Sequence, residues 1–267
     1  MNLFFSTVRR LVRRPATWVT FGLLAALNVL ILLAVAVTRG GGEAAFDPLA
    51  LVTFPGAYAQ ILGFTFGLGA LFALIYGAAI AGSEWSWGTL KAVVARGESR
   101  ALYALATFAG IAFVAVVALL VSFGIGVLGG IAGATLAGVS LDGLGDAAAL
   151  MALPDSFARG ALGIVTLSGL GFGIATLARS QLAGIGVGIG VYFAGTFAAV
   201  FLPDFVQYLP FQLSNTALGV SGSGGGAFGG AATTGISADL ALVLLGAWLI
   251  GLLAVSAGFT ERADITG

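Results

Sequence analysis

The chain has 267 residues, of which 59% are hydrophobic and only 8% are charged, with eleven basic residues balancing eleven acidic ones. The zero net charge provides no basic surface for nucleic acid, and the absence of cysteine and histidine excludes disulfides, thiol nucleophiles, zinc clusters and histidine-dependent catalysis. No catalytic or metal-binding residues are therefore predicted.

The first 15 residues predict a helix that lies in the membrane interface. Apolar residues at positions 4, 5, 8, 11 and 12 form one stripe at 100° per residue, and the basic residues fall mostly opposite it. These basic residues are Arg9, Arg10, Arg13 and Arg14, whose guanidinium groups are expected near anionic lipid headgroups. The alternative is an irregular basic segment that only sets orientation. Pro15 should then turn the chain into the first span.

Six long neutral stretches predict an all-α, polytopic membrane protein with one transmembrane domain over residues 1–267, because about 20 apolar residues of helix cross a bilayer. The expected spans are 17–37, 57–81, 101–128, 159–178, 182–202 and 239–259. With these spans, nine of the eleven basic residues fall on one side and seven of the eleven acidic residues on the other. Cytoplasmic loops carry the excess of Lys and Arg, so both termini are predicted to be cytoplasmic.

Two stretches on the opposite side are expected to be outer regions. Residues 129–150 are rich in glycine and alanine and contain two aspartates, which predicts a loop. Residues 203–238 contain Pro210 and a glycine-rich run at 222–226. They are expected to form a short outer or re-entrant helix followed by a flexible loop.

Glycines recur four residues apart in several spans, a spacing that lets helix backbones approach closely in lipid. The pairs are Gly63/Gly67, Gly126/Gly130, Gly169/Gly173, Gly184/Gly188 and Gly186/Gly190. Ordinary packing within the bundle is favoured over a dimer seam or a sliding interface. The fifth span, with glycine at every second position from 184 to 190, is the best candidate for a close or mobile contact.

The segment 82–100 is predicted to be a cytoplasmic loop that contacts a partner. It holds two of the four tryptophans and the only lysine of the chain. Leu90, Val93 and Val94 share one face of a short helix over 88–95, which Gly97 can end in the left-handed conformation. A short amphipathic helix suits docking into a partner's groove.

Glu84, at the inner end of the second span, has three open interpretations. It forms an ion pair with Lys91, Arg96 or Arg100, it reaches a partner protein, or it faces water at the helix end. A role as a catalytic acid is excluded because no second carboxylate lies at a suitable spacing.

The pattern small–Glu–aromatic–x–x–Gly–Thr–Leu–Lys–x–x–x–x–Arg–x–x–Ser–Arg, placed after the second of six spans, resembles the type 2 ABC transporter permease. The residues in or within this pattern are Glu84, Trp85, Trp87, Gly88, Thr89, Leu90, Lys91, Arg96, Ser99 and Arg100. The basic first helix resembles that family's elbow helix, and residues 203–238 resemble its outer re-entrant segment. Some members of that family carry a large outer domain between the first two spans, where this chain has only a short connection.

The resemblance implies a permease subunit of an ATP-driven exporter, in the plasma membrane of a prokaryote, whose 82–100 loop couples it to a separate ATPase. The implied partners are two copies of the ATPase, a second permease subunit, identical or different, and membrane lipids. The single lysine follows Leu90, so the chain has no Walker A sequence. ATP and Mg²⁺ are thus expected on the ATPase, and this chain is expected to be neither an enzyme nor a holder of cofactors.

No acidic or basic residue falls at mid-depth in the predicted spans, which argues against proton antiport and against a strongly charged cargo. A lipid, peptide or drug is compatible with such an interior, and export is favoured over import. Polar residues such as Asn28, Tyr76 and Thr107 are expected to form hydrogen bonds between helices. Two other classes stay open: an ATP-independent six-span channel or carrier, and a non-transporting subunit of a membrane complex.

Overall fold

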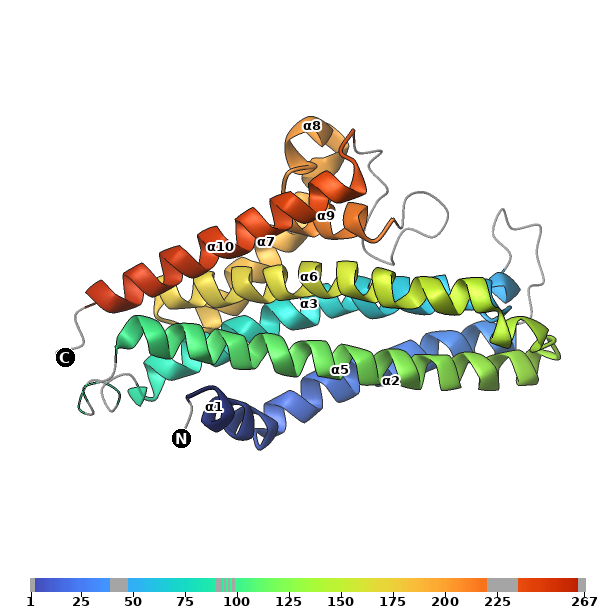
Figure 1. Cartoon of the computed structure of the whole chain (residues 1–267), viewed down its shortest axis with the longest axis horizontal. Coiled ribbons are helices and arrows are strands. Elements are labelled where there is room, and N and C mark those ends of the chain that lie inside the picture. Colours follow the sequence, from blue (N-terminus) through green and yellow to red (C-terminus); the bar gives the residue numbers. More distant parts are fainter. Residues whose placement is uncertain are drawn as a thin grey trace.

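The computed structural model describes residues 3–38, 48–89, 99–219 and 235–263, together with 93, 95 and 97. Every regular element within these residues is a helix (Figure 1). Six of the described helices are long and apolar enough to cross a membrane, which confirms the predicted number of spans. They are α2 (Pro15–Thr38), α3 (Gly56–Ser86), α5 (Arg100–Ala137), α6 (Ala147–Ala178), α7 (Gln181–Phe201) and α10 (Ala238–Arg262).

Shorter helices precede or connect the spans. They are α1 (Leu3–Val12), η1 (Pro48–Leu51), η2 (Asp142–Gly145), α8 (Pro203–Val206) and α9 (Pro210–Ala217). Pro15 is the first residue of α2, where its missing N–H costs nothing, and it separates α1 from the first span as expected. The spans α5, α6, α7 and α10 each begin after a capping side chain that accepts a hydrogen bond from the backbone three residues on. The caps are Ser99, Asp146, Ser180 and Ser237.

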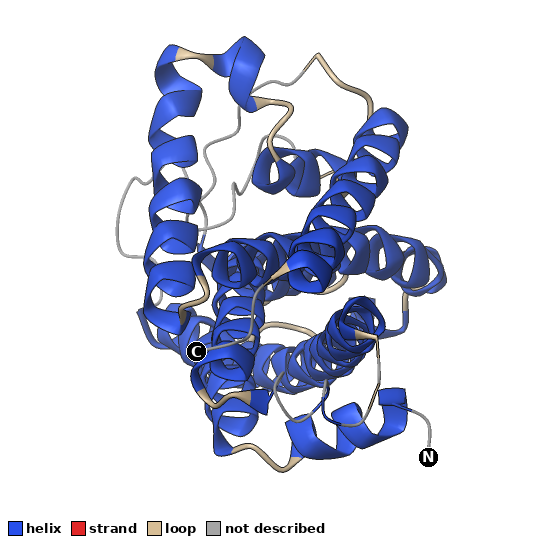
Figure 2. Ribbon diagram, turned by 90° about the vertical axis from the view of Figure 1, so that its left-hand side faces the viewer, coloured by secondary structure: helices blue, strands red, loops and turns tan. Residues whose placement is uncertain are grey.

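One end of the bundle gathers the chain segments that the charge pattern places together. It contains α1, the last turn of α3, the first turn of α5, the α6–α7 turn and the last turn of α10 (Figure 1). We call it the basic end, because its described charged residues are mostly arginines, at positions 9, 10, 13, 14, 100, 179 and 262. Figure 2 views the molecule from this end.

The predicted outer loop at 129–150 is wrong in its extent. α5 continues to Ala137 and α6 begins at Ala147, so the connection covers only 138–146. Glycine is frequent both in turns and where two helices pack closely, so glycine content alone does not distinguish a loop from a packed helix. Here Gly129 and Gly133 lie within α5 and pack against α2. Gly138, with φ of 74°, is the residue that ends α5. The 38 residues of α5 measure about 57 Å, well beyond a hydrocarbon core of about 30 Å.

The second span is also longer than predicted. α3 continues through Ser86, so residues 82–86 of the expected loop are helical. Its polar last turn stays within the bundle because Ser83 and Glu84 are buried and have partners there. The loop therefore starts at Trp87, and Gly88 makes the turn with φ of 65°.

The closest backbone contact described lies between α3 and α6. A Cβ added at Gly171 of α6 would overlap the carbonyl oxygen of Leu74, and one added at Gly77 of α3 would overlap the carbonyl oxygen of Ser168. Helices approach this closely only where the side chain is a hydrogen atom, and the approach brings Cα–H groups against facing carbonyls. The two helices thus form the tightly packed centre of the bundle.

The glycines of α7 fall on two different faces. A Cβ at Gly184 would collide with Ala175 of α6 and one at Gly188 with Leu74 of α3, whereas Gly186 and Gly190 have nothing within 4 Å. One four-residue pair thus packs inside the bundle, as favoured above, and the other faces outward.

Buried polar side chains join the spans to one another. The Asn28 side-chain amide donates to the hydroxyls of Thr65 at 3.1 Å and Ser122 at 3.4 Å, which connects α2, α3 and α5. The Thr17 hydroxyl donates to the Leu11 carbonyl at 2.7 Å, so the Tyr76 hydroxyl, 2.8 Å away, donates to Thr17. Asn28 and Tyr76 thus form the expected interhelical hydrogen bonds, whereas the Thr107 hydroxyl has no partner among the described residues.

The region 203–238 contains helices, as predicted, and α9 is mostly buried. Gly195 of α7 packs against the Phe211 ring, and Gly163 of α6 packs against Ser214. The Trp248 indole of α10 donates to the Tyr208 carbonyl at 2.9 Å and holds the α8–α9 turn. The glycine-rich run at 222–226 lies outside the described residues.

Candidate functional site

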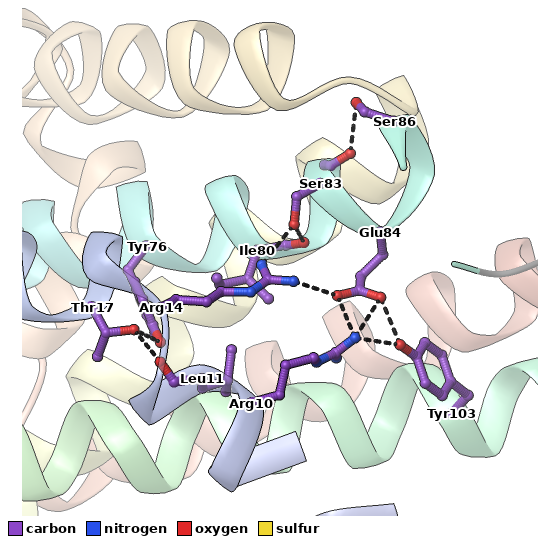
Figure 3. Close-up of polar contacts among 11 residues, drawn as sticks. Arg10, Leu11, Arg14, Thr17, Tyr76, Ile80, Ser83, Glu84, Ser86 and Tyr103 are labelled. Atoms are coloured by element: carbon purple, nitrogen blue, oxygen red, sulfur yellow. Dashed lines mark hydrogen bonds and ion pairs between the residues drawn. The ribbon is translucent and has the colours of Figure 1, made fainter. Parts of the chain in front are cut away.

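A buried carboxylate occupies the last turn of α3. Glu84 is only 4% exposed, and Figure 3 shows it between two arginines and a tyrosine. Arg10 Nη1 lies 3.0 Å from Oε1 and 3.1 Å from Oε2 of Glu84, and Arg14 Nη2 lies 3.4 Å from Oε1. The Tyr103 hydroxyl donates to Oε2 at 2.6 Å and accepts from Arg10 Nη1 at 2.9 Å. These four residues, hereafter the Glu84 cluster, connect α1, α3, α5 and the residue before α2.

Arg14 makes further contacts with the same turn. Its Nη1 donates to the Ser83 hydroxyl at 2.9 Å, and Ser83 in turn donates to the Ile80 carbonyl at 2.8 Å (Figure 3). The Arg14 guanidinium also lies over the Trp87 ring, 4.7 Å from its centroid. A planar guanidinium suits this combination of carboxylate, hydroxyl and aromatic face, and a lysine would not reproduce it.

Both arginines keep their charge in this environment. Burial lowers the pKa of Arg14 below its ordinary value, and the charge of Glu84 opposes that shift. Burial also acts to lower the pKa of Arg10, but the charges and hydrogen bonds of Glu84 and Tyr103 raise it overall. The ordinary pKa of arginine lies so far above neutrality that both groups stay protonated at neutral pH. The cluster therefore holds two positive charges against one buried carboxylate.

The opposite side of the same turn contacts two more parts of the bundle. The Arg179 guanidinium lies 5.2 Å from the centroid of the Trp85 ring and 5.3 Å from that of Phe259. Arg179 ends α6 with φ of 50°, and Phe259 belongs to α10. Gly82 packs directly against the backbone of Gln181, the first residue of α7.

The last turn of α3 therefore contacts every other helical segment at the basic end. The Glu84 cluster holds α1 and α5, while Trp85 and Gly82 hold the α6–α7 turn and α10. Val93 is fully buried and packs with Tyr103 and Trp85, which attaches the following segment to the same site. No group of three or more acidic side chains that would bind a metal ion occurs among the described residues.

Residues 49–266 match the family described as a protein of unknown function, DUF2705. The chain belongs to the DUF2705 family. The matched segment of this DUF2705 protein runs from η1 to the end of α10, and so contains Glu84 and Tyr103 but not Arg10 and Arg14. No curated protein matches the chain.

The predicted coupling residues of the DUF2705 protein divide by their surroundings. Glu84 and Trp85 pack inside, as described, and Ser99 caps α5. Arg100 Nη1 donates to the Ala263 carbonyl at 2.7 Å, which ties α5 to the end of α10. Trp87 is 68% exposed, Ser99 is also exposed, and Gly88 and Thr89 are half-buried. The remaining members, Leu90, Lys91 and Arg96, lie outside the described residues.

The predicted pairing of Glu84 with Arg100 is wrong, and the other two predicted partners, Lys91 and Arg96, lie outside the described residues. Arg100 bonds instead to the end of α10, and the carboxylate pairs with Arg10 and Arg14 rather than facing water. Sequence spacing shows which side chains are close along one helix, whereas these partners lie 74 and 70 positions away. A buried carboxylate requires a compensating charge, and α1 brings Arg10 to it while the residue before α2 is Arg14.

Only half of the basic residues that were predicted at the membrane interface are exposed. Arg9 and Arg13 are exposed, while Arg10 and Arg14 are committed to Glu84. The predicted apolar stripe is also divided, since Leu11 is fully buried among the helices and Phe5 is 66% exposed. Both faces of the predicted helix are therefore partly covered by the rest of the protein.

Three residues of the site were not predicted: Tyr103, Arg179 and Phe259. Tyr103 lies four residues after the Ser99 cap, and nothing in that position marks it as a partner for a carboxylate. Arg179 was noted only for its charge. The spacing of Arg10 and Arg14, four apart and so on one helical face, is the one pattern that could have indicated a shared buried acceptor.

Proposed function

We propose that this DUF2705 protein is the permease subunit of an ATP-driven exporter, driven by a separate ATPase that binds residues 82–100. The observation that carries the proposal is the last turn of α3, where Glu84 and Trp85 hold α1, α5, the α6–α7 turn and α10. A push on this turn is delivered to all of these segments together. Such an arrangement suits a protein that receives mechanical work at one end.

The Glu84 cluster makes this end of the bundle act as one body. Glu84 is buried, so separating it from its arginines leaves uncompensated charges, at a cost of about 3–5 kcal/mol. The packing of Gly82 on Gln181 allows no gap between α3 and the start of α7. Work applied to the loop is therefore transmitted to the spans rather than absorbed by local bending.

The outward-facing residues after α3 are the proposed contact for the ATPase. Trp87 supplies an exposed aromatic face, and Gly88 and Thr89 lead into the segment that contains Lys91 and Arg96. In the proposed complex the basic end faces the cytoplasm, as the excess of arginine favours. Two ATPases and a second permease subunit complete the transporter, and its cargo is hydrophobic or amphipathic because the spans carry no charge at mid-depth.

Co-purification tests the proposal. The tagged protein, expressed in its native host and extracted in mild detergent, is expected to carry a P-loop ATPase in equal stoichiometry. Deleting residues 88–95 should release the ATPase, while deleting 222–226, in the predicted outer loop, should not. Membrane insertion of both variants serves as the control. Full ATPase recovery with the 88–95 deletion, or transport by the isolated chain in vesicles, would contradict the proposal and favour an ATP-independent carrier.

A further inference from the structure

A small cavity adjoins the Glu84 cluster. It measures about 20 Å³ and lies among α3, α5, α6 and α10. The residues that line it include five with oxygen-bearing side chains, namely Glu84, Tyr103, Thr107, Thr176 and Thr260. A space of at least roughly 10–15 Å³, with two to four polar partners, is what one buried water molecule requires.

Thr107 gives the cavity a hydrogen-bond donor without a partner. The residue is 1% exposed, and its hydroxyl has no hydrogen-bond partner among the described residues. The other two threonines of the cavity use their protons within their own helices, since Thr176 donates to the Phe172 carbonyl at 2.8 Å and Thr260 donates to the Ser256 carbonyl at 2.7 Å. A buried hydroxyl left without a partner is destabilising, and such groups in native proteins are usually satisfied by protein or water.

We infer that this cavity binds one ordered water molecule. The water accepts the Thr107 proton and donates to two of the oxygens that have free lone pairs, on Glu84, Thr176 and Thr260. A sodium or potassium ion fits less well, because Arg10 and Arg14 already place two positive charges beside the same carboxylate. A neutral water molecule satisfies the Thr107 hydroxyl without adding charge.

The bound water extends the Glu84 cluster to helices that it does not otherwise reach. Glu84 bonds directly to α1 and α5, and the water joins this network to Thr176 of α6 and Thr260 of α10. The inference concerns a buried hydroxyl and its ligand, and it stands whether or not an ATPase binds the protein.

The substitution Thr107→Val distinguishes a hydrated cavity from a dry one, because it is expected to lower the melting temperature only if water is bound. Valine has the shape of threonine without the hydroxyl. If water is bound, the variant loses a hydrogen bond of the network and the melting temperature falls by roughly 2–4 °C. If the cavity is dry, valine removes only an unsatisfied group, so an unchanged or raised melting temperature would overturn the inference.

Water-edited solid-state NMR of the wild-type protein in bilayers gives an independent readout. Thr53 is exposed and Thr65 is buried in the Asn28 hydrogen bonds, so they provide the wet and dry references. Magnetisation from water is expected to reach Thr107 well before Thr65. Build-up at Thr107 as slow as at Thr65 would show a dry cavity and overturn the inference.

Discussion

Replacing Glu84 with glutamine is expected to destabilise the protein by about 3–5 kcal/mol and to release the proposed ATPase partner. The variant keeps the shape of the side chain but leaves Arg10 and Arg14, which are both partly buried, without a compensating charge. Arg14 then loses the interaction that holds it over Trp87, and α1 is expected to separate from α3. Equilibrium unfolding in mild detergent measures the first effect, and co-purification measures the second.

The matched control for Glu84→Gln is Asp155→Asn. Asp155 also pairs with an arginine, 2.7 Å from Arg159 Nε, but its side chain is 70% exposed. Exposed pairs contribute about 0–1 kcal/mol, so this variant should unfold like the wild type. Equal effects of the two substitutions would mean that burial of Glu84 contributes nothing, and retention of the ATPase by Glu84→Gln would remove the cluster from the coupling path.

Replacing Gly171 with alanine is expected to destabilise the protein by about 1–3 kcal/mol, the usual range for overpacking, and leucine should prevent folding altogether. The added Cβ would overlap the Leu74 carbonyl. Its nearest neighbours are all backbone atoms of α3, so no flexible side chain can move aside. α3 and α6 must therefore separate along their whole contact. Thermal unfolding of the detergent-solubilised protein measures the alanine effect, and the yield of monodisperse protein measures the leucine effect.

Gly186→Ala is the control for Gly171→Ala, since Gly186 has nothing within 4 Å in this chain. It is expected to be neutral, or stabilising by at most about 1 kcal/mol through helix propensity. A Gly171→Ala protein as stable as the wild type would contradict the close α3–α6 contact. Loss of stability in Gly186→Ala would instead place a second subunit against the outward face of α7.

The six spans could be predicted from the sequence because a charged side chain in hydrocarbon is costly, so the spacing of charges marks the spans directly. The ends of the spans could not be predicted equally well. At 129–137, glycine and alanine indicate a loop and a closely packed helix alike, and only contact with α2 decides between them. At 82–86, polar residues indicated the end of a helix, although Arg14 and Tyr103 bond to Ser83 and Glu84 and keep that turn buried.

The site itself was predicted in part. Glu84 was identified by a local motif, and a motif of this kind describes only residues that are close together in the sequence. Its partners come from α1 and α5, far along the chain, so they depend on how the helices pack rather than on any spacing. The helical wheel of the first residues likewise separates apolar from basic positions, but whether lipid, water or protein covers each face is decided only in the folded chain.

Site-specific photo-crosslinking at position 87 tests the central claim most directly. Trp87 is 68% exposed at the basic end, and Phe201, 80% exposed at the far end of α7, provides a matched aromatic control. With a photoreactive phenylalanine at either position and illumination of intact cells, position 87 is expected to crosslink to a P-loop ATPase and position 201 is not. Crosslinks from position 87 only to lipid or to extracellular protein would contradict the claim that this end receives work from a nucleotide-hydrolysing partner.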